Sequence, residues 1–284
     1  MTTNGKVTLT LAALVALAAT QGSEVRGDEA VPSGIGQPPP PPPGKYPPES
    51  VSGVMVPIPA TQKFRGALQY RSINAFAIDQ TEVTVKAYQQ CVIASGCTVP
   101  AGRAHLGSAW VRPDRVSHPV TDVTWDQAKA FCSWAGKRLP LSLEWEYAGG
   151  DTVRQAYPWG ATMNPAALCW SGPGNTVRAS GITAETCPVD TYRSDARVWG
   201  SAAVIGLAGN AAEWVDGTYH EGPHTYKKGQ PPAPPYDGHT HRGGSGLTTV
   251  AVEASITWSS GRAPIHPEHS FADVGFRCAR TLTK

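Results

Sequence analysis

The sequence predicts a mixed α+β domain with little regular secondary structure, held together by disulfides. The chain of 284 residues contains 30 glycines and 26 prolines, and only 16% of its residues are charged. This composition is typical of a loop-rich domain rather than a helix bundle. Few segments show a clear helical or strand period. Six cysteines are present, enough for three disulfides that can hold long loops in place.

The folded part is predicted to begin at about Val54, and its first elements are a strand and a helix. Residues 73–83 alternate apolar and polar side chains, which predicts a strand. Thr84 is predicted to cap a helix over 85–94, which Gly96 ends.

Two further helices and a closing strand are predicted downstream. In TWDQAKAFCSWAG (124–136), the first threonine and the glutamine three residues later form a capping box, and the final glycine occupies a C′ position. A short helix is expected after Pro140, with Ser142 as its cap. Residues 274–280 (VGFRCAR) are predicted to form one closing strand.

The N-terminus is predicted to be a secretory signal peptide covering residues 1–18. Lys6 precedes an apolar run over 7–19, which is short of the ~20 residues that span a bilayer. A buried N-terminal helix is the alternative. We therefore expect a secreted or periplasmic protein with no membrane span.

Residues 19–53 are predicted to be a proline-rich linker, followed by a folded domain over 54–284. The six prolines Pro38–Pro43 cannot donate backbone hydrogen bonds, so a stiff polyproline II spacer is expected. A docking site for a proline-reading module is the alternative. A formal charge of +2 gives no reason to expect nucleic acid as a partner.

The cysteines are expected to form three disulfides, because their number is even and the signal peptide implies an oxidising compartment. No CxxC spacing occurs, which argues against zinc or thioredoxin-like chemistry. Spacing alone cannot choose among fifteen possible pairings. Cys91–Cys97 and Cys169–Cys187 would each close a short loop, leaving Cys132–Cys278 as the third pair.

Several segments, taken in order, resemble the formylglycine-generating enzyme family, also called the sulfatase-modifying-factor family. They are MVPIP (55–59), AIDQTEVT (77–84), HPVTDVTWDQAKAFCSWAGKRLPLSLEWEYA (118–148), YPWG (157–160), GLAGNAAEWVDG (206–217), RGGS (242–245) and GFRCAR (275–280). The resemblance implies a single domain of the formylglycine-generating-enzyme type, distantly related to C-type lectins. It also supports a Cys132–Cys278 bridge.

Enzymes of that family oxidise a sulfatase cysteine to formylglycine, using two thiolates that hold Cu(I). The resemblance places those thiols near Thr249 and Ala254, and no cysteine occurs between Cys187 and Cys278. We therefore assign no catalytic residue and do not expect Cu(I), which needs soft sulfur ligands.

Two other groups of side chains could replace the missing thiols. Cys169 and Cys187 are better explained by a disulfide. The histidines at 239 and 241 are predicted to lie in a surface loop within 221–241, and those at 266 and 269 follow later.

The segment GNAAEW matches a structural calcium site of the family, in which Asn210 and Glu213 are side-chain ligands. Oxygen ligands suit Ca²⁺. In the alternative interpretation, Asn210 caps a turn and Glu213 pairs with an arginine.

Three functions remain open. The first is a secreted, non-catalytic family member, expected to be a monomer, that binds an unknown protein or peptide as an accessory protein. The second is an active formylglycine-generating oxidoreductase with a relocated metal site. The third is another peptide- or protein-maturation enzyme, in which Glu253, Trp258 or His266 shape a new pocket.

Overall fold

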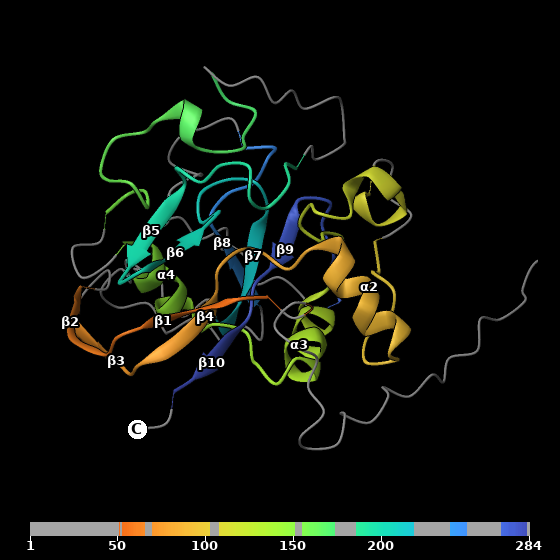
Figure 1. Cartoon of the computed structure of the whole chain (residues 1–284), viewed down its shortest axis with the longest axis horizontal. Helices are drawn as coiled ribbons and strands as arrows, with labels where there is room; N and C mark the ends of the chain where they lie inside the picture. Colours follow the sequence, from red (N-terminus) through yellow and green to blue (C-terminus); the bar gives the residue numbers. More distant parts are fainter. Residues whose placement is uncertain are drawn as a thin grey trace, which may run out of the picture. The chain divides into compact units, whose positions relative to one another are not determined.

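The computed structural model describes residues 51, 53–65, 70–102, 108–150, 155–173, 186–218, 239–248 and 268–282. All of them belong to the unit that covers Gln37–Lys284. Within these residues, short helices surround several small sheets (Figure 1). The predicted signal peptide lies outside the described residues, as does the predicted linker except for residues 51 and 53.

One antiparallel sheet joins the start and the end of the domain. Its strand order is β1–β4–β10, with β1 at Met55–Ile58, β4 at Phe76–Asp79 and β10 at Ala279–Thr281. Every residue of β4 is buried, which explains its apolar composition. The single strand predicted over 73–83 is not continuous in the structure. Of these residues, only Ile73, in another strand, and those of β4 are paired in sheets.

The residues just before β4 belong to a separate hairpin. Strand β3 (Tyr70–Ile73) pairs with β2 (Thr61–Arg65), and β4 pairs with β1 and β10 instead. A second hairpin is formed by β5 (Ala196–Trp199) and β6 (Ala202–Ile205).

A three-stranded sheet with order β8–β7–β9 carries the segments that the sequence analysis singled out. Strand β7 (Ala212–Thr218) lies between β8 (His239–Arg242), which is antiparallel to it, and β9 (Val274–Phe276), which is parallel. The predicted strand 274–280 was wrong in one respect, because it is two strands in two sheets. The break comes at Arg277 and Cys278, whose side chains are fully buried.

Three described α-helices pack beside these sheets: α2 (Val85–Ile93), α3 (Trp125–Trp134) and α4 (Ser142–Gly150). The predicted caps of the first two are confirmed, since the side chain of Thr84 caps α2 and a Thr124–Gln127 capping box begins α3.

The predicted capping role of Ser142 was wrong. The hydroxyl of Ser142 accepts a hydrogen bond from Arg242 Nε at 2.7 Å, so it links α4 to β8. At the start of α4, the carboxylate of Glu144 instead accepts the N–H of Leu141 at 2.8 Å.

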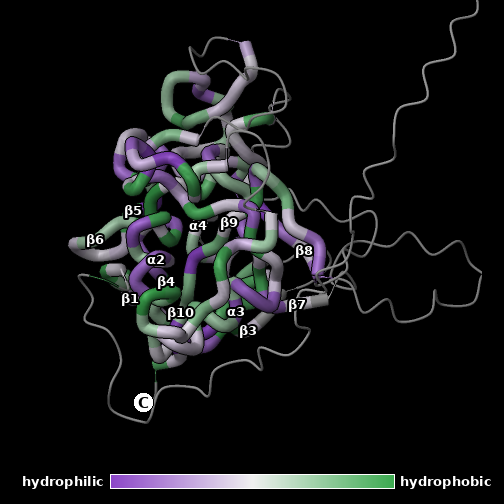
Figure 2. The backbone as a smooth tube through the Cα atoms, turned by 90° about the vertical axis from the view of Figure 1, so that its right-hand side faces the viewer, coloured by the Kyte–Doolittle hydropathy of each residue, from purple (hydrophilic) through white to green (hydrophobic). Residues whose placement is uncertain are grey.

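Two main apolar clusters form the core. One lies among α2, α3 and β9, and the other among β1, β4, β10 and α4. Figure 2 shows apolar and polar segments interleaved along the chain, as expected when each short element buries one side.

The three expected disulfides are all present: Cys91–Cys97, Cys132–Cys278 and Cys169–Cys187. The second links α3 to the residue that precedes β10, and therefore crosses most of the domain. None of the helices described is both long and apolar enough to span a bilayer.

Candidate functional site

Arg277, which follows β9, is a fully buried charge. Its side chain and that of Glu213 are 0% and 1% exposed. Arg277 Nη2 lies 2.6 Å from Glu213 Oε1, and Arg277 Nε lies 2.7 Å from Glu213 Oε2. The guanidinium also donates to backbone carbonyls, including that of Gly206 at 2.7 Å. This bidentate geometry is the strong form of an arginine–carboxylate pair.

Two further carboxylates are buried near the same guanidinium, namely Glu82 and Asp195. Burial raises the pKa of each to about 8, although Arg277 partly opposes the effect. Glu82 Oε2 and Asp195 Oδ1 have no hydrogen-bond partner. Three carboxylates therefore lie near one guanidinium, and burial favours the neutral form of the two that are not paired with it.

Asn210 joins this centre to the neighbouring disulfide loop. Its amide Nδ2 donates to Glu82 Oε1 at 2.9 Å, and its Oδ1 accepts the N–H of Cys187 at 2.8 Å. Asn210 has a φ of 57°, a left-handed conformation that asparagine tolerates better than most residues. The residue therefore stabilises a turn, as the alternative interpretation of GNAAEW expected.

The side chains of Asn210 and Glu213 do not fit a calcium ion in this arrangement. Both oxygens of Glu213 face the guanidinium of Arg277, and Glu213 Oε2 also accepts the indole N–H of Trp145 at 2.7 Å. A hard cation needs several oxygen ligands that face one open position. Among the described residues, no group of three or more His, Cys, Asp or Glu side chains could hold a metal ion. The calcium assignment stays a prediction.

The RGGS turn follows β8 at the edge of the three-stranded sheet. Arg242 Nη1 lies 3.5 Å from Glu146 Oε2, and both side chains are buried. Gly243 has a φ of 96°, and a Cβ there would lie 3.0 Å from the ring of Trp145 and 3.1 Å from the carbonyl of Leu207. Only glycine therefore allows the turn to approach the core this closely.

Hydroxyl groups and backbone groups close the remainder of this turn. The Ser245 hydroxyl donates to Asp273 Oδ2 at 2.7 Å, and the Ser245 N–H donates to the Thr248 hydroxyl at 2.8 Å. The hydroxyl of Ser171, which lies within the loop closed by the Cys169–Cys187 bridge, donates to the carbonyl of Gly246. The turn is thus a fixed platform at the place where the family resemblance expects the groove.

The two histidines of the H-x-H sequence do not lie in a surface loop, as was predicted, but on β8. The His239 ring stacks on Trp125 with a centroid distance of 3.7 Å, and the His241 ring packs edge-on against Trp214 at 5.6 Å. Burial lowers the pKa of His241 to about 4 and also lowers the pKa of His239. The surrounding aromatic rings therefore hold both imidazoles in packing roles.

All six cysteines of the chain are in disulfides. In this arrangement no cysteine is a free thiol, the kind of soft ligand that Cu(I) prefers. The positions that resemble the family's thiols, Thr249 and Ala254, lie outside the described residues, as do Glu253, Trp258 and His266.

The model of the sulfatase-modifying factor enzyme 1-like domain matches residues 51–282. The chain belongs to this family. The match covers every described residue.

The curated relatives of this family domain include active and inactive proteins. The chain is 30% identical over 209 residues to the formylglycine-generating enzyme of Bos taurus, covering 67% of this chain and 52% of that protein. It is 31% identical over 218 residues to the formylglycine-generating enzyme of Streptomyces coelicolor, covering 66% and 63%. It is also 29% identical over 174 residues to the inactive C-alpha-formylglycine-generating enzyme 2 of Bos taurus, covering 58% and 51%. The family domain here thus spans less than two thirds of the length of each.

Solved structures confirm the fold of this sulfatase-modifying-factor domain. CarF superposes with a TM-score of 0.56 at 18% identity, covering 82% of this chain and 100% of that chain. PvdO from Pseudomonas aeruginosa gives a TM-score of 0.52 at 17% identity, covering 80% and 94%. At these identities the likeness concerns the fold alone.

Sequence reasoning missed the partners of this family domain's buried centre. It expected an arginine opposite Glu213 in one interpretation, but it did not identify Arg277, nor did it single out Glu82 or Asp195. A signal was present, because Arg277 stands inside the apolar run VGFRCA, where a charge must find a buried partner.

Proposed function

We propose that this protein is a non-catalytic member of the sulfatase-modifying-factor family that acts as an accessory protein by binding a protein or peptide. One observation carries the proposal: all six cysteines are in disulfides, so the chain has no thiolate pair for Cu(I). The similarity to inactive C-alpha-formylglycine-generating enzyme 2 of Bos taurus and Mus musculus supports it, although the active relatives are as similar in identity.

In this proposal the partner binds at the end of the β8–β7–β9 sheet, where the RGGS turn, itself buried, supports the binding surface from beneath. The Ser245–Asp273 hydrogen bond and the Gly243 contact with Trp145 make the turn rigid. A rigid platform can bind a partner with little ordering cost. The distant relation to C-type lectins that the family resemblance implies is part of this proposal.

We also propose that the protein is exported and acts as a monomer in an oxidising compartment. Three disulfides suit such a compartment, since the cytosol keeps most thiols reduced. Mass spectrometry of the protein purified from its native host should find the mature N-terminus near residue 19. A mature chain that begins at Met1 would contradict export by the predicted signal peptide.

The catalytic part of the proposal is tested with Cu(I) and a cysteine-containing sulfatase peptide under oxygen. The expected result is no formylglycine aldehyde by mass spectrometry, while an active formylglycine-generating enzyme, run as the control, converts the same peptide. A thiol titration of the unreduced, unfolded protein should find no free thiol. Aldehyde formation by this protein, together with stoichiometric Cu(I) uptake, would show that it is an oxidase with a relocated metal site.

A further inference from the structure

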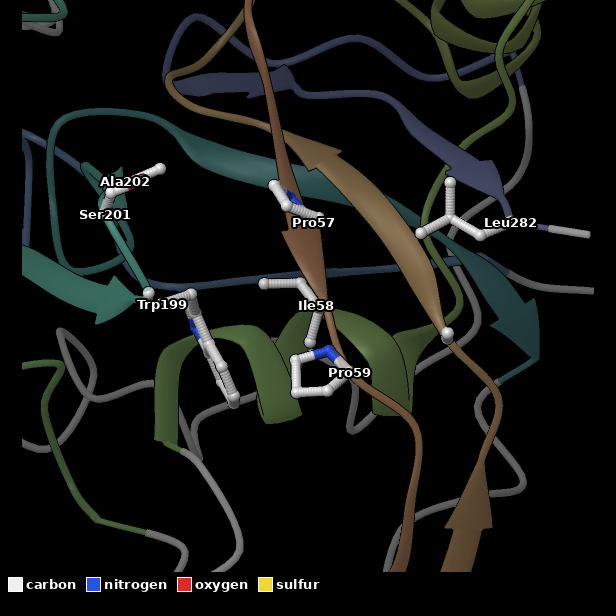
Figure 3. A pocket seen from close by; sticks show the side chains of 9 residues that line it. Pro57, Ile58, Pro59, Trp199, Ser201, Ala202 and Leu282 are labelled. Carbon is white, nitrogen blue, oxygen red and sulfur yellow. The ribbon is translucent and has the colours of Figure 1, made fainter. Parts of the chain in front are cut away.

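An apolar pocket lies between strand β1 and the turn of the β5–β6 hairpin (Figure 3). Its volume is about 480 Å³, and its lining includes Pro57, Pro59, Trp199, Ala202 and Leu282. The pocket lies away from the RGGS turn in sequence and is lined by different elements. No role has been assigned to this pocket by the family resemblance, by the centre around Arg277 or by the proposed function.

The indole of Trp199 is fixed at one side of this pocket. Its Nε1 donates to the carbonyl of Ala148 at 2.8 Å, and its ring lies edge-on to Tyr147 with a centroid distance of 5.1 Å. Because the N–H group is already bonded, the tryptophan offers an occupant its apolar ring rather than a hydrogen-bond donor.

The opposite side of the pocket comes from β1, which is an edge strand of its sheet. Pro57 and Pro59 are exposed and carry no backbone N–H. At these two positions β1 therefore has no donor to offer to a strand that might otherwise pair with this edge. An occupant must therefore be recognised through apolar contacts. A polyproline II segment meets this condition, because it has no internal hydrogen bonds and binds aromatic-lined grooves through its rings.

The chain itself contains such a segment close to the pocket in sequence, the run Pro38–Pro43. Residues 44–50 join this run to Val51 and can span about 23 Å when extended, at ~3.3 Å per residue. The path from Val51 to Pro57 covers at most about 20 Å on the same basis. Gly53, just before β1, has a φ of 95°, a left-handed conformation that glycine adopts readily. The connection is therefore long enough for the run to fold back onto the pocket.

We propose that the proline run Pro38–Pro43 of this chain binds in the pocket formed by Pro57, Pro59, Trp199, Ala202 and Leu282. The run would then attach the N-terminal segment to the domain instead of acting as a free spacer. The short connection gives the run a high effective concentration at the pocket, so weak apolar contacts suffice to hold it. This inference does not depend on whether the protein is catalytic.

The proposal is tested by photo-crosslinking in the full chain. Gln37→p-benzoylphenylalanine places a photoreactive group directly before the run. After irradiation, mass spectrometry should find adducts within one chain on the peptides that contain Pro57–Pro59 or Trp199–Ala202. The same group at Gln230, next to the second proline-rich segment (PPAPP, 231–235), is the matched control and should give at least fivefold fewer adducts there.

A pair of leucine substitutions tests the pocket itself. Leu282→Glu places a carboxylate in the apolar lining, where Leu282 is 38% exposed, and should lower the yield of adducts at least fivefold. Leu141→Glu changes a leucine that is 47% exposed at the start of α4, outside the lining, and should leave the yield unchanged. Circular dichroism checks that both variants fold as the parent chain does.

Four results would overturn the proposal. Attachment of the Gln37 group mainly to peptides elsewhere in the domain would show that the run does not bind the pocket. Stronger labelling of the pocket by the Gln230 group would make PPAPP the occupant. Adducts between two chains would show that the run binds a second copy. A normal yield in folded Leu282→Glu would show that the pocket is not the binding site.

Discussion

The centre around Arg277 and the turn around Ser245 lie at two parts of the same three-stranded sheet, yet different interactions hold them. At the centre, fully buried charged groups are joined by hydrogen bonds as short as 2.6 Å. At the turn, two left-handed glycines and several hydroxyl–backbone contacts define the path of the chain. The ion pair at the centre is 0% and 1% exposed, and the turn is buried as well, although it follows the edge strand of the sheet.

This contrast indicates which part of the family fold is independent of the family's chemistry. The Arg277–Glu213 pair, the Cys132–Cys278 bridge and the capping box of α3 involve none of the family's copper-binding thiols, so they do not depend on them. The family fold can therefore persist without its reaction.

The largest expected loss of stability comes from removing disulfides, one of which lies beside the centre and one beside the turn. Replacing Cys132 and Cys278 by serine opens a link across 146 residues, beside Arg277, and should cost about 5 kcal/mol of unfolding free energy. Replacing Cys169 and Cys187, a separation of 18 residues beside the turn, should cost about 3 kcal/mol. Urea unfolding of the two double variants measures the difference in unfolding free energy. A larger loss for the Cys169 and Cys187 variant would contradict the expectation that the bridge beside Arg277 contributes more to stability.

Next in size is the loss of a buried arginine. Arg277→Met leaves Glu213 unpaired beside two more carboxylates and should cost about 3–5 kcal/mol. Arg242→Met removes a single hydrogen bond to Ser142 and a 3.5 Å ion-pair contact with Glu146, and should cost about 1–3 kcal/mol. Arg112→Met, whose pair with Asp114 is exposed, is the control and should change stability by less than about 1 kcal/mol. Equal losses for Arg277 and Arg242 would remove the contrast between the regions.

Some of these features could be predicted from the sequence and others could not. Local sequence signals predicted the helices, because a threonine followed by a glutamine three residues later forms the capping box that begins α3. For the disulfides, spacing alone left fifteen pairings open; two short loops suggested two of the pairs, and the family resemblance supported the third, Cys132–Cys278. These features depend on neighbours in the sequence or on a small set of possible partners.

Long-range geometry was not predictable in the same way. The break at Arg277 depends on a guanidinium that turns inward to Glu213, 64 residues earlier in the chain. Likewise, His239 and His241 lie in a Pro- and Gly-rich region, and their strand exists only because β7 pairs with it. Sequence patterns describe a residue's neighbours along the chain but not the partner that the fold brings beside it.

The pH dependence of stability should distinguish the centre from the turn. Burial raises the folded-state pKa of Glu82 and Asp195 to about 8, from usual values near 4, so the folded protein holds protons that the unfolded chain has lost. Their contribution is complete below about pH 4 and is lost as the pH rises through about 8. Each retained proton lowers stability by about 1 kcal/mol per pH unit across this window.

Other groups narrow the pH range in which this effect can be measured. His241, whose pKa is lowered to about 4, acts in the opposite direction below about pH 6.5, and Asp79, with a pKa of about 6, titrates in the same lower range. Urea unfolding between pH 6.5 and 8.5 should therefore show falling stability. Glu82→Gln should flatten that slope, while Asp114→Asn at the exposed surface should not. A slope that is unchanged in folded Glu82→Gln would place the protons elsewhere.

The smallest expected effect concerns calcium at Asn210 and Glu213. A ligand that binds the folded state raises stability by RT ln(1 + [L]/Kd), about 2.7 kcal/mol at a hundredfold excess over Kd. Because the guanidinium of Arg277 occupies the face of Glu213 that a cation would need, thermal unfolding in millimolar Ca²⁺ and in excess EDTA should agree within about 1 °C. Stabilisation by calcium that disappears in Asn210→Ala would mean that the ion displaces Arg277 from Glu213. The centre would then be a metal site of the family and not a self-contained ion pair.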